Sequence, residues 1–271
     1  MENFELILPE IFISLSIMFL LILGVFKKDS SRLIQNISLI VLLITAVITF
    51  NETLGINEVT LFNKSIIIDY LSSFMKIVTL IAAFLVLVVS SNYLKSLKIF
   101  KIEYPILILS SVLGMMIMIS SNDLIVFYMG LELQSLALYV LATFNRDQIK
   151  SSEAGLKYFV LSALSSGLLL YGCSLIYGFT GSTNFDVIAN QLNSSEYALT
   201  FGIVFILVEL AFKISAVPFH MWAPDVYEGA PTSITLFFTM VPKIAALTVF
   251  IRFLYVPFLN LIDQWQMILI F

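Results

Sequence analysis

The chain has 271 residues, of which 60% are hydrophobic and 12% charged, and its mean hydropathy is +1.02. Soluble domains are about half apolar and a quarter charged, so this composition excludes a soluble globular protein and predicts many membrane spans. A net charge of −4 argues against a nucleic-acid partner, and a single cysteine excludes an internal disulfide and a four-thiolate metal site.

Long unbroken apolar runs predict an all-α polytopic membrane protein, because a membrane helix needs about 20 apolar residues. The acidic N-terminus MENFELILPE lacks the basic region of a secretory signal, so the first run is expected to be a retained span. A further span is expected to begin after Pro257, and because the chain stops at Phe271 we expect a truncated chain forming one transmembrane domain, residues 1–271. The expected spans before it are Leu6–Phe26, Leu33–Phe50, Leu71–Tyr93, Tyr104–Ser120, Leu124–Phe144, Glu153–Tyr177, Ala198–Val217 and Thr232–Tyr255.

Basic residues gather after every second span. Cytoplasmic loops carry an excess of lysine and arginine, so these loops are expected on the cytoplasmic side or its organellar equivalent, with the N-terminus opposite. The residues are Lys27, Lys28 and Arg32, then Lys95, Lys98 and Lys101, then Arg146 and Lys150.

Ionisable residues inside expected spans are costly in lipid and are therefore functional hypotheses. Glu132 lies near the middle of its span, where a carboxyl balanced between burial and a nearby ammonium can exchange a proton; the alternative is a glutamate hydrogen-bonded for helix packing. Lys157 lies about one turn into its span, so it serves proton transfer or extends its stem to the headgroups.

Lys213 and Glu209 share a helix face at i, i+4 and form a possible local ion pair, which either makes the span insertable or holds the lysine charged. The only histidine, His220, follows between Pro218 and Pro224, and relay and packing roles are both open. Helix breaks in membranes are tolerated beside water or inside protein, so the interruption predicts a hydrated path.

Lys243 follows Pro242 near the middle of the last complete span, too deep to reach the surface. Proline removes a backbone donor there, and a desolvated lysine can load and release a proton. We therefore expect Glu132, Lys157, Lys213, His220 and Lys243 to be buried groups of a proton path.

Competing chemistry finds little support in the sequence. One histidine and one cysteine exclude a haem pair, an iron–sulfur set or a zinc site, and no glycine-rich phosphate loop is present. No cofactor is expected in this chain. The glycines are expected to mark close helix contacts; they are Gly130, Gly155, Gly167, Gly172 and Gly178.

Three segments resemble the antiporter-like membrane subunits of respiratory complex I: GLELQSLALYVLA, EAGLKYFVLSALSSGLLLYGCSLIYGFTG and FKISAVPFHMWAPDVYEGAPT. The ending DVYEGAPT is most similar to the N-type subunits. This resemblance implies a fourteen-helix fold with inverted repeats, a helix broken at span seven, and a second repeat beyond Phe271. It also implies proton-transfer roles for Glu132, Lys157, Lys213 and Lys243, with His220 and Pro218 in the PFH element.

The resemblance further implies a proton-translocating subunit of NADH:quinone oxidoreductase, with L-, M- and K-type membrane subunits and lipids as partners. NADH, FMN, iron–sulfur clusters and quinone are then expected in partner subunits, and the bacterial inner membrane is expected, with the mitochondrial inner membrane as the alternative. A sodium/proton antiporter subunit is the alternative function, and a structural scaffold is a third. Glu209 stands where the family leads us to expect a small or apolar residue.

Overall fold

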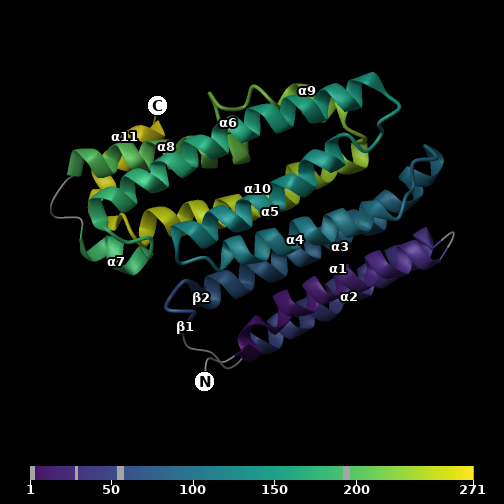
Figure 1. Ribbon diagram of the computed structural model, residues 1–271, viewed down its shortest axis with the longest axis horizontal. Helices are drawn as coiled ribbons and strands as arrows, with labels where there is room; N and C mark the ends of the chain where they lie inside the picture. The colour runs from purple at the N-terminus through teal and green to yellow at the C-terminus, as the bar shows by residue number, and fades with distance from the viewer. Residues whose placement is uncertain (1–3, 28–29, 54–57, 192–195, 271) are drawn as a thin grey trace.

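The computed structural model describes residues 4–27, 30–53, 58–191 and 196–270, so Lys28 and Phe271 lie outside the described residues. Long helices run side by side as a bundle, and the chain crosses it repeatedly (Figure 1). The elements are η1 (Phe4–Ile7), α1 (Leu8–Phe26), α2 (Ser31–Thr53), β1 (Val59–Leu61), β2 (Ile66–Ile68), α3 (Tyr70–Ser96), α4 (Glu103–Ile119), α5 (Leu124–Ala142), α6 (Ile149–Thr180), α7 (Phe185–Asn190), α8 (Glu196–Ile214), α9 (Ala223–Gly229), α10 (Thr232–Tyr255), η3 (Leu259–Leu261) and α11 (Ile262–Ile270).

The predicted spans agree with the helices. Within the described residues, six helices are long and apolar enough to cross a membrane: η1 with α1, α2, α3, α5, α6 and α10. α4 is a shorter apolar helix, and α8 has 19 residues, about 28 Å at 1.5 Å per residue. After Pro257 the chain forms η3 and the nine residues of α11.

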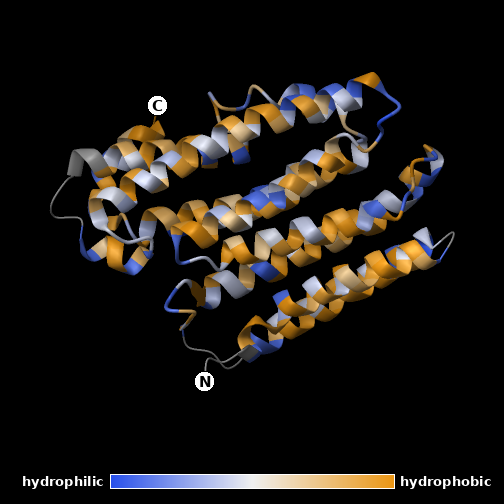
Figure 2. Cartoon of the chain, viewed as in Figure 1, coloured by the Kyte–Doolittle hydropathy of each residue, from blue (hydrophilic) through white to orange (hydrophobic). Residues whose placement is uncertain are grey.

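The outer surface of the bundle is apolar. Large side chains such as Leu15, Phe19 and Leu164 are more than half exposed. Hydrophobic residues line the helices along their lengths, and many hydrophilic residues lie at helix ends and turns (Figure 2). An exposed apolar belt is what lipid contact requires, because soluble proteins rarely expose such patches.

One end of the bundle, here called the hairpin end, carries the β hairpin and α7 (Figure 1). Strands β1 and β2 pair antiparallel, with Thr60 opposite Ile67. The Ile67 N–H donates to the Ser120 carbonyl at 2.8 Å, and the Asn122 N–H donates to the Ser65 carbonyl at 2.9 Å. These bonds fix the hairpin to the turn between α4 and α5, where the sequence predicts only a loop.

α4 and α5 pack with their backbones in contact, because two glycines face each other. A Cβ built on Gly130 would lie 2.8 Å from the Met118 nitrogen, and one built on Gly114 would lie 2.5 Å from the Gln134 nitrogen. The prediction of close contacts is also confirmed at Gly155 and Gly172. It is wrong for Gly167 and Gly178, which have nothing within 4 Å of an added Cβ in the described structure.

α10 is tied to the start of α3 by a buried ion pair. Arg252 Nη2 lies 2.8 Å from Asp69 Oδ1, and the arginine side chain is 2% exposed. Asp69 also caps α3, accepting from the Ser72 N–H at 2.8 Å. Burial raises the pKa of Asp69, but the Arg252 charge and the hydrogen bonds lower it further, so the net pKa is below its ordinary value.

We expect acid to weaken the attachment of α3 to α10. A carboxyl whose folded pKa is depressed stabilises the fold fully above its unfolded pKa of about 3.9, and that stabilisation is lost as the pH falls through the lower folded pKa. The midpoint temperature of thermal unfolding of the parent should fall as the pH is lowered through this range. Asp69→Asn should reduce the slope of midpoint temperature against pH. An unchanged slope in the variant would contradict this role.

Candidate functional site

The helix interruption that follows α8 is a capped helix C-terminus. Ser215 has φ of +60°, in the left-handed region. The Ala216 N–H donates to the Ala211 carbonyl at 2.8 Å, and the Ser215 N–H donates to the Phe212 carbonyl at 3.1 Å. These two bonds form a Schellman motif, which satisfies carbonyls that the helix end leaves open. The broken helix expected at this span is confirmed.

The Trp222 indole completes the terminus by donating Nε1–H to the Phe212 carbonyl at 3.0 Å. The chain then enters α9, with Pro224 in its first turn, where a missing N–H removes no helical bond. Pro218 lies exposed in the turn, and Pro242 lies buried inside α10. The break therefore places Lys213 at the last turn of α8, within the protein interior.

Lys213 is the most enclosed of the five residues predicted to transfer protons, with its side chain 3% exposed. Its ammonium donates to Ser135 Oγ on α5 at 2.8 Å and to Ser162 Oγ on α6 at 2.7 Å. Tyr139 Oη donates to the same Ser162 oxygen at 2.6 Å. Two hydroxyls from neighbouring helices thus hold the charge that α8 carries into the bundle.

Aromatic rings enclose this ammonium. The Lys213 nitrogen lies 5.9 Å from the ring centroids of Tyr139, Tyr158 and Phe212. Trp222 stacks on Tyr158 with centroids 4.6 Å apart. Aromatic faces attract a cation and exclude water, so the site holds a charged lysine without exposing it.

Two carboxylates share the electrostatic environment of Lys213. Glu209 Oε1 lies 3.5 Å from Lys213 Nζ, and the glutamate side chain is 0% exposed. Neither Glu209 oxygen has a hydrogen-bond partner in the described structure, and the same holds for Glu132 Oε1. Glu132 interacts electrostatically with both members of the pair. Glu209 is therefore the direct partner of the lysine, and Glu132 acts on it at longer range.

Lys243 lies on α10, partly buried, with its nitrogen 5.6 Å from the Tyr227 ring centroid. Tyr227 belongs to α9, and its hydroxyl lies 3.4 Å from Ser215 Oγ in the break. This contact brings Lys243 to the segment that follows Lys213. The structure thus places both lysines against the interruption of the helix.

The prediction that all five proton-path groups are buried holds only for Lys213, because Glu132, Lys157 and Lys243 are partly buried and His220 is exposed. The Lys157 side chain is 40% exposed, and its nitrogen lies 2.7 Å from Asp225 Oδ2 and 2.8 Å from Glu153 Oε1. It faces a cavity of about 130 Å³ beside Glu228. Lysine stems extend to solvent from the first turns of a span. His220 is exposed because it lies in the irregular turn, outside the packed helices.

We expect Lys157→Met to change the midpoint of thermal unfolding little, because exposed ion pairs contribute little to stability. A double-mutant cycle with Asp225→Asn should likewise give only a small coupling between the two residues in thermal unfolding. A loss of assembly in Lys157→Met with Asp225→Asn unaffected would contradict this structural assignment.

Sequence reasoning missed several polar residues. Ser135 and Ser162 bind Lys213. The position of Ser135, one turn after Glu132 on the same helix, was the sequence pattern that could have indicated its role. Buried Lys76 and Arg252 also lie within expected spans, at 4% and 2% exposure. Within the described ranges, no group of three or more His, Cys, Asp or Glu residues is placed to hold a metal.

Residues 121–271 match the family model described as NADH:quinone oxidoreductase/Mrp antiporter, TM, which is more than half of the chain. The chain belongs to this family. Glu132, Lys213 and Lys243 all lie inside the matched range, which confirms the family that the sequence motifs indicate.

Curated relatives extend the similarity to the whole chain. NADH-quinone oxidoreductase subunit N of Pelagibacter ubique is 72% identical over 271 residues, covering 100% of this chain and 57% of that protein. The subunit N of Bartonella bacilliformis is 53% identical over 274 residues, covering 98% of this chain and 56% of that protein. The chain spans about half the length of the curated relatives it matches.

Solved structures support the NADH:quinone oxidoreductase/Mrp antiporter fold. A chain of respiratory complex I from Thermus thermophilus with bound Aureothin matches with a TM-score of 0.78 at 27% identity, covering 90% of this chain and 52% of that chain. A chain of the Mrp complex from Dietzia sp. matches with a TM-score of 0.78 at 22% identity, covering 94% and 49%, and supports the fold alone.

Proposed function

We propose that this chain forms part of a proton-translocating membrane subunit of NADH:quinone oxidoreductase, respiratory complex I. The observation that supports it most is the 72% identity over the whole chain to a protein named NADH-quinone oxidoreductase subunit N. The buried Lys213–Glu209 pair adds a physical reason, because ionisable groups inside membrane spans are costly and mark proton or ion paths.

The proposed mechanism is electrostatic. Two unit charges 4 Å apart interact by about 4 kcal/mol at an effective dielectric constant of 20, and the Lys213–Glu209 separation is 3.5 Å. A proton leaving Lys213 removes the positive charge that stabilises the Glu209 carboxylate. That loss favours protonation of the glutamate, so charge movement at one site is felt at the next.

The hydroxyls around Lys213 offer short transfer steps. Ser135 and Ser162 each lie within hydrogen-bond distance of the ammonium, and Tyr139 bonds Ser162. Lys243 lies beyond the break, against Tyr227. In this proposal the path runs from Glu132 past Lys213 to Lys243, while Lys157 and His220 lie at the exposed side of the broken helix.

The assembly around this chain is part of the same proposal. The neighbours would be L-, M- and K-type membrane subunits in the bacterial inner membrane, with lipid on the apolar belt. NADH, FMN, iron–sulfur clusters and quinone would act in partner subunits. The described helices would then form the N-terminal helices and the first proton-transfer repeat of the subunit.

Purification of the tagged full-length subunit tests this function against sodium/proton exchange. We expect it to co-purify with NADH:quinone oxidoreductase activity, and NADH oxidation in sealed vesicles should drive proton uptake. A sodium/proton antiporter would instead exchange sodium for protons without NADH. Sodium exchange together with an absence of NADH-linked activity would overturn the proposal.

A further inference from the structure

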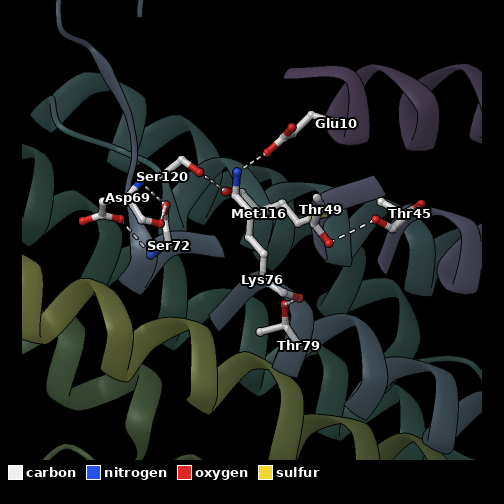
Figure 3. Close-up of polar contacts among 9 residues, drawn as sticks. All are labelled: Glu10, Thr45, Thr49, Asp69, Ser72, Lys76, Thr79, Met116 and Ser120. Atoms are coloured by element: carbon white, nitrogen blue, oxygen red, sulfur yellow. Dashed lines mark hydrogen bonds and ion pairs between the residues drawn. The ribbon is translucent and has the colours of Figure 1, made fainter. Parts of the chain in front are cut away.

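A second buried ion pair lies far from Lys213, between α1 and α3. Lys76 Nζ lies 2.6 Å from Glu10 Oε1, and the two side chains are 5% and 11% exposed. Figure 3 shows the Lys76 side chain extending from α3 toward Glu10 on α1. Both residues lie outside the range 121–271 that matches the family model.

The cluster around the pair carries an excess of negative charge. Glu52, partly buried on the last turn of α2, interacts electrostatically with Glu10 and Lys76 but forms no ion pair with the lysine in the described structure. One ammonium therefore faces one directly paired carboxylate and a second acid at longer range. Like charges in a poorly solvated place disfavour full ionisation, so a bound proton would neutralise the cluster.

Glu10 has a free acceptor for such a proton. Its Oε2 is buried and has no hydrogen-bond partner in the part of the chain that the structure describes, while Oε1 bonds the lysine. A buried carboxylate oxygen without a partner is unfavourable, since native structures pair nearly all such atoms. Binding of a proton, delivered by a hydronium ion that becomes water, would relieve it.

A cavity connects this cluster with the hairpin end. It has a volume of about 190 Å³ and is lined by Ile7, Glu10, Ile66, Ile68, Lys76, Ile117 and Ser120. A water molecule in the liquid takes about 30 Å³, so several waters fit. Around the pair, α2 contributes Glu52, the turn after α4 contributes neutral Ser120, and β2 contributes two isoleucines.

We propose that Glu10, Glu52 and Lys76 form a second proton-binding site, reached by water from the hairpin end through the cavity beneath β2. A hydronium ion in the cavity gives its proton to one carboxylate, which becomes a neutral carboxyl, and water remains. Release is the reverse step. By the distribution of lysine and arginine, the hairpin end is the one expected to face away from the cytoplasm.

Infrared difference spectroscopy of the full-length subunit in its assembled complex, at neutral pH and with isotope-labelled glutamate, tests the proton count. The difference between the parent and Glu10→Gln spectra should show one protonated glutamate C=O band that exchanges in D2O, which separates it from the bands of other glutamates such as Glu209. Glu10→Gln and Glu52→Gln should each abolish it completely, because one carboxylate then balances one ammonium. Lys76→Met should double it, since neither acid retains a cationic partner.

Glu58→Gln is the matched control, because Glu58 is an exposed acid beside the hairpin, and its spectrum should equal that of the parent. The glutamine variants preserve side-chain shape, so they remain informative if Lys76→Met does not fold. A band unchanged in both glutamine variants would overturn the proposal. Lys213→Ala should leave this band intact, and the additional band expected from Glu209, which loses its cation, should persist in Glu10→Gln; failure of the proposed function is therefore distinguishable.

Access from the hairpin end is tested by thiol labelling. In a Cys173→Ser background, Ile117→Cys should react with a membrane-impermeant thiol reagent added on that side. Met115→Cys, in the fully buried core of the same helix, should react at least about tenfold more slowly. Equal rates would show that no water path reaches the cluster, which would contradict the proposed route.

Discussion

Replacing Lys213 by alanine should reduce NADH-driven proton uptake by about tenfold or more in vesicles that carry the assembled complex. A positioned proton-transfer group contributes about a hundredfold or more in rate, and no second ammonium takes the place between Ser135 and Ser162 in the described structure. NADH oxidation and proton uptake should be measured side by side. Coupled turnover should fall together with uptake.

Two further variants serve as controls for this result. Lys27→Ala removes an exposed lysine at the end of α1 and should match the parent. Lys213→Ala leaves Glu209 buried without its cation, which can hinder folding, so Glu209→Gln with Lys213→Met removes both charges together. If the assembled double variant pumps at the parental rate, Lys213 is structural and the proposed mechanism is wrong.

Gly130→Ala should destabilise the subunit by about 3 kcal/mol, although alanine is the better helix former. The added Cβ would lie 2.8 Å from the Met118 nitrogen and 3.0 Å from the Gly114 carbonyl oxygen. Both are backbone atoms, so α4 and α5 must move apart to admit a methyl group. The measurement is thermal unfolding of the purified full-length subunit.

Gly167→Ala provides the matched control on α6, where nothing lies within 4 Å of an added Cβ in the described structure. It should be neutral or stabilising by up to about 1 kcal/mol, the helix-propensity gain of alanine over glycine. Equal losses in both variants would show that the α4–α5 contact is not the cause. Because α5 carries Ser135 and Glu132, Gly130→Ala should also lower proton uptake.

The sequence alone determined the membrane class and most of the helices. Apolar runs of about 20 residues have one structural solution in lipid, a helix, so composition placed α1 to α6 and α10 closely. Motifs near Glu132 and Lys213 also led to the family that the comparisons show. The prolines after Lys213 located the break, since proline removes a backbone donor and disfavours helix continuation.

Tertiary structure decided which charges meet. Ser135 and Ser162 bind Lys213 across 78 and 51 residues of sequence, and Glu10 binds Lys76 across 66 residues. Helix periodicity fixes neighbours within one helix, as for Glu209 and Lys213, but carries no information on which helices pack together. The exposure of His220 depended on the path of the broken segment, which backbone hydrogen bonds at Ser215 and Ala216 set, whereas that of Lys157 follows from its place near the start of α6.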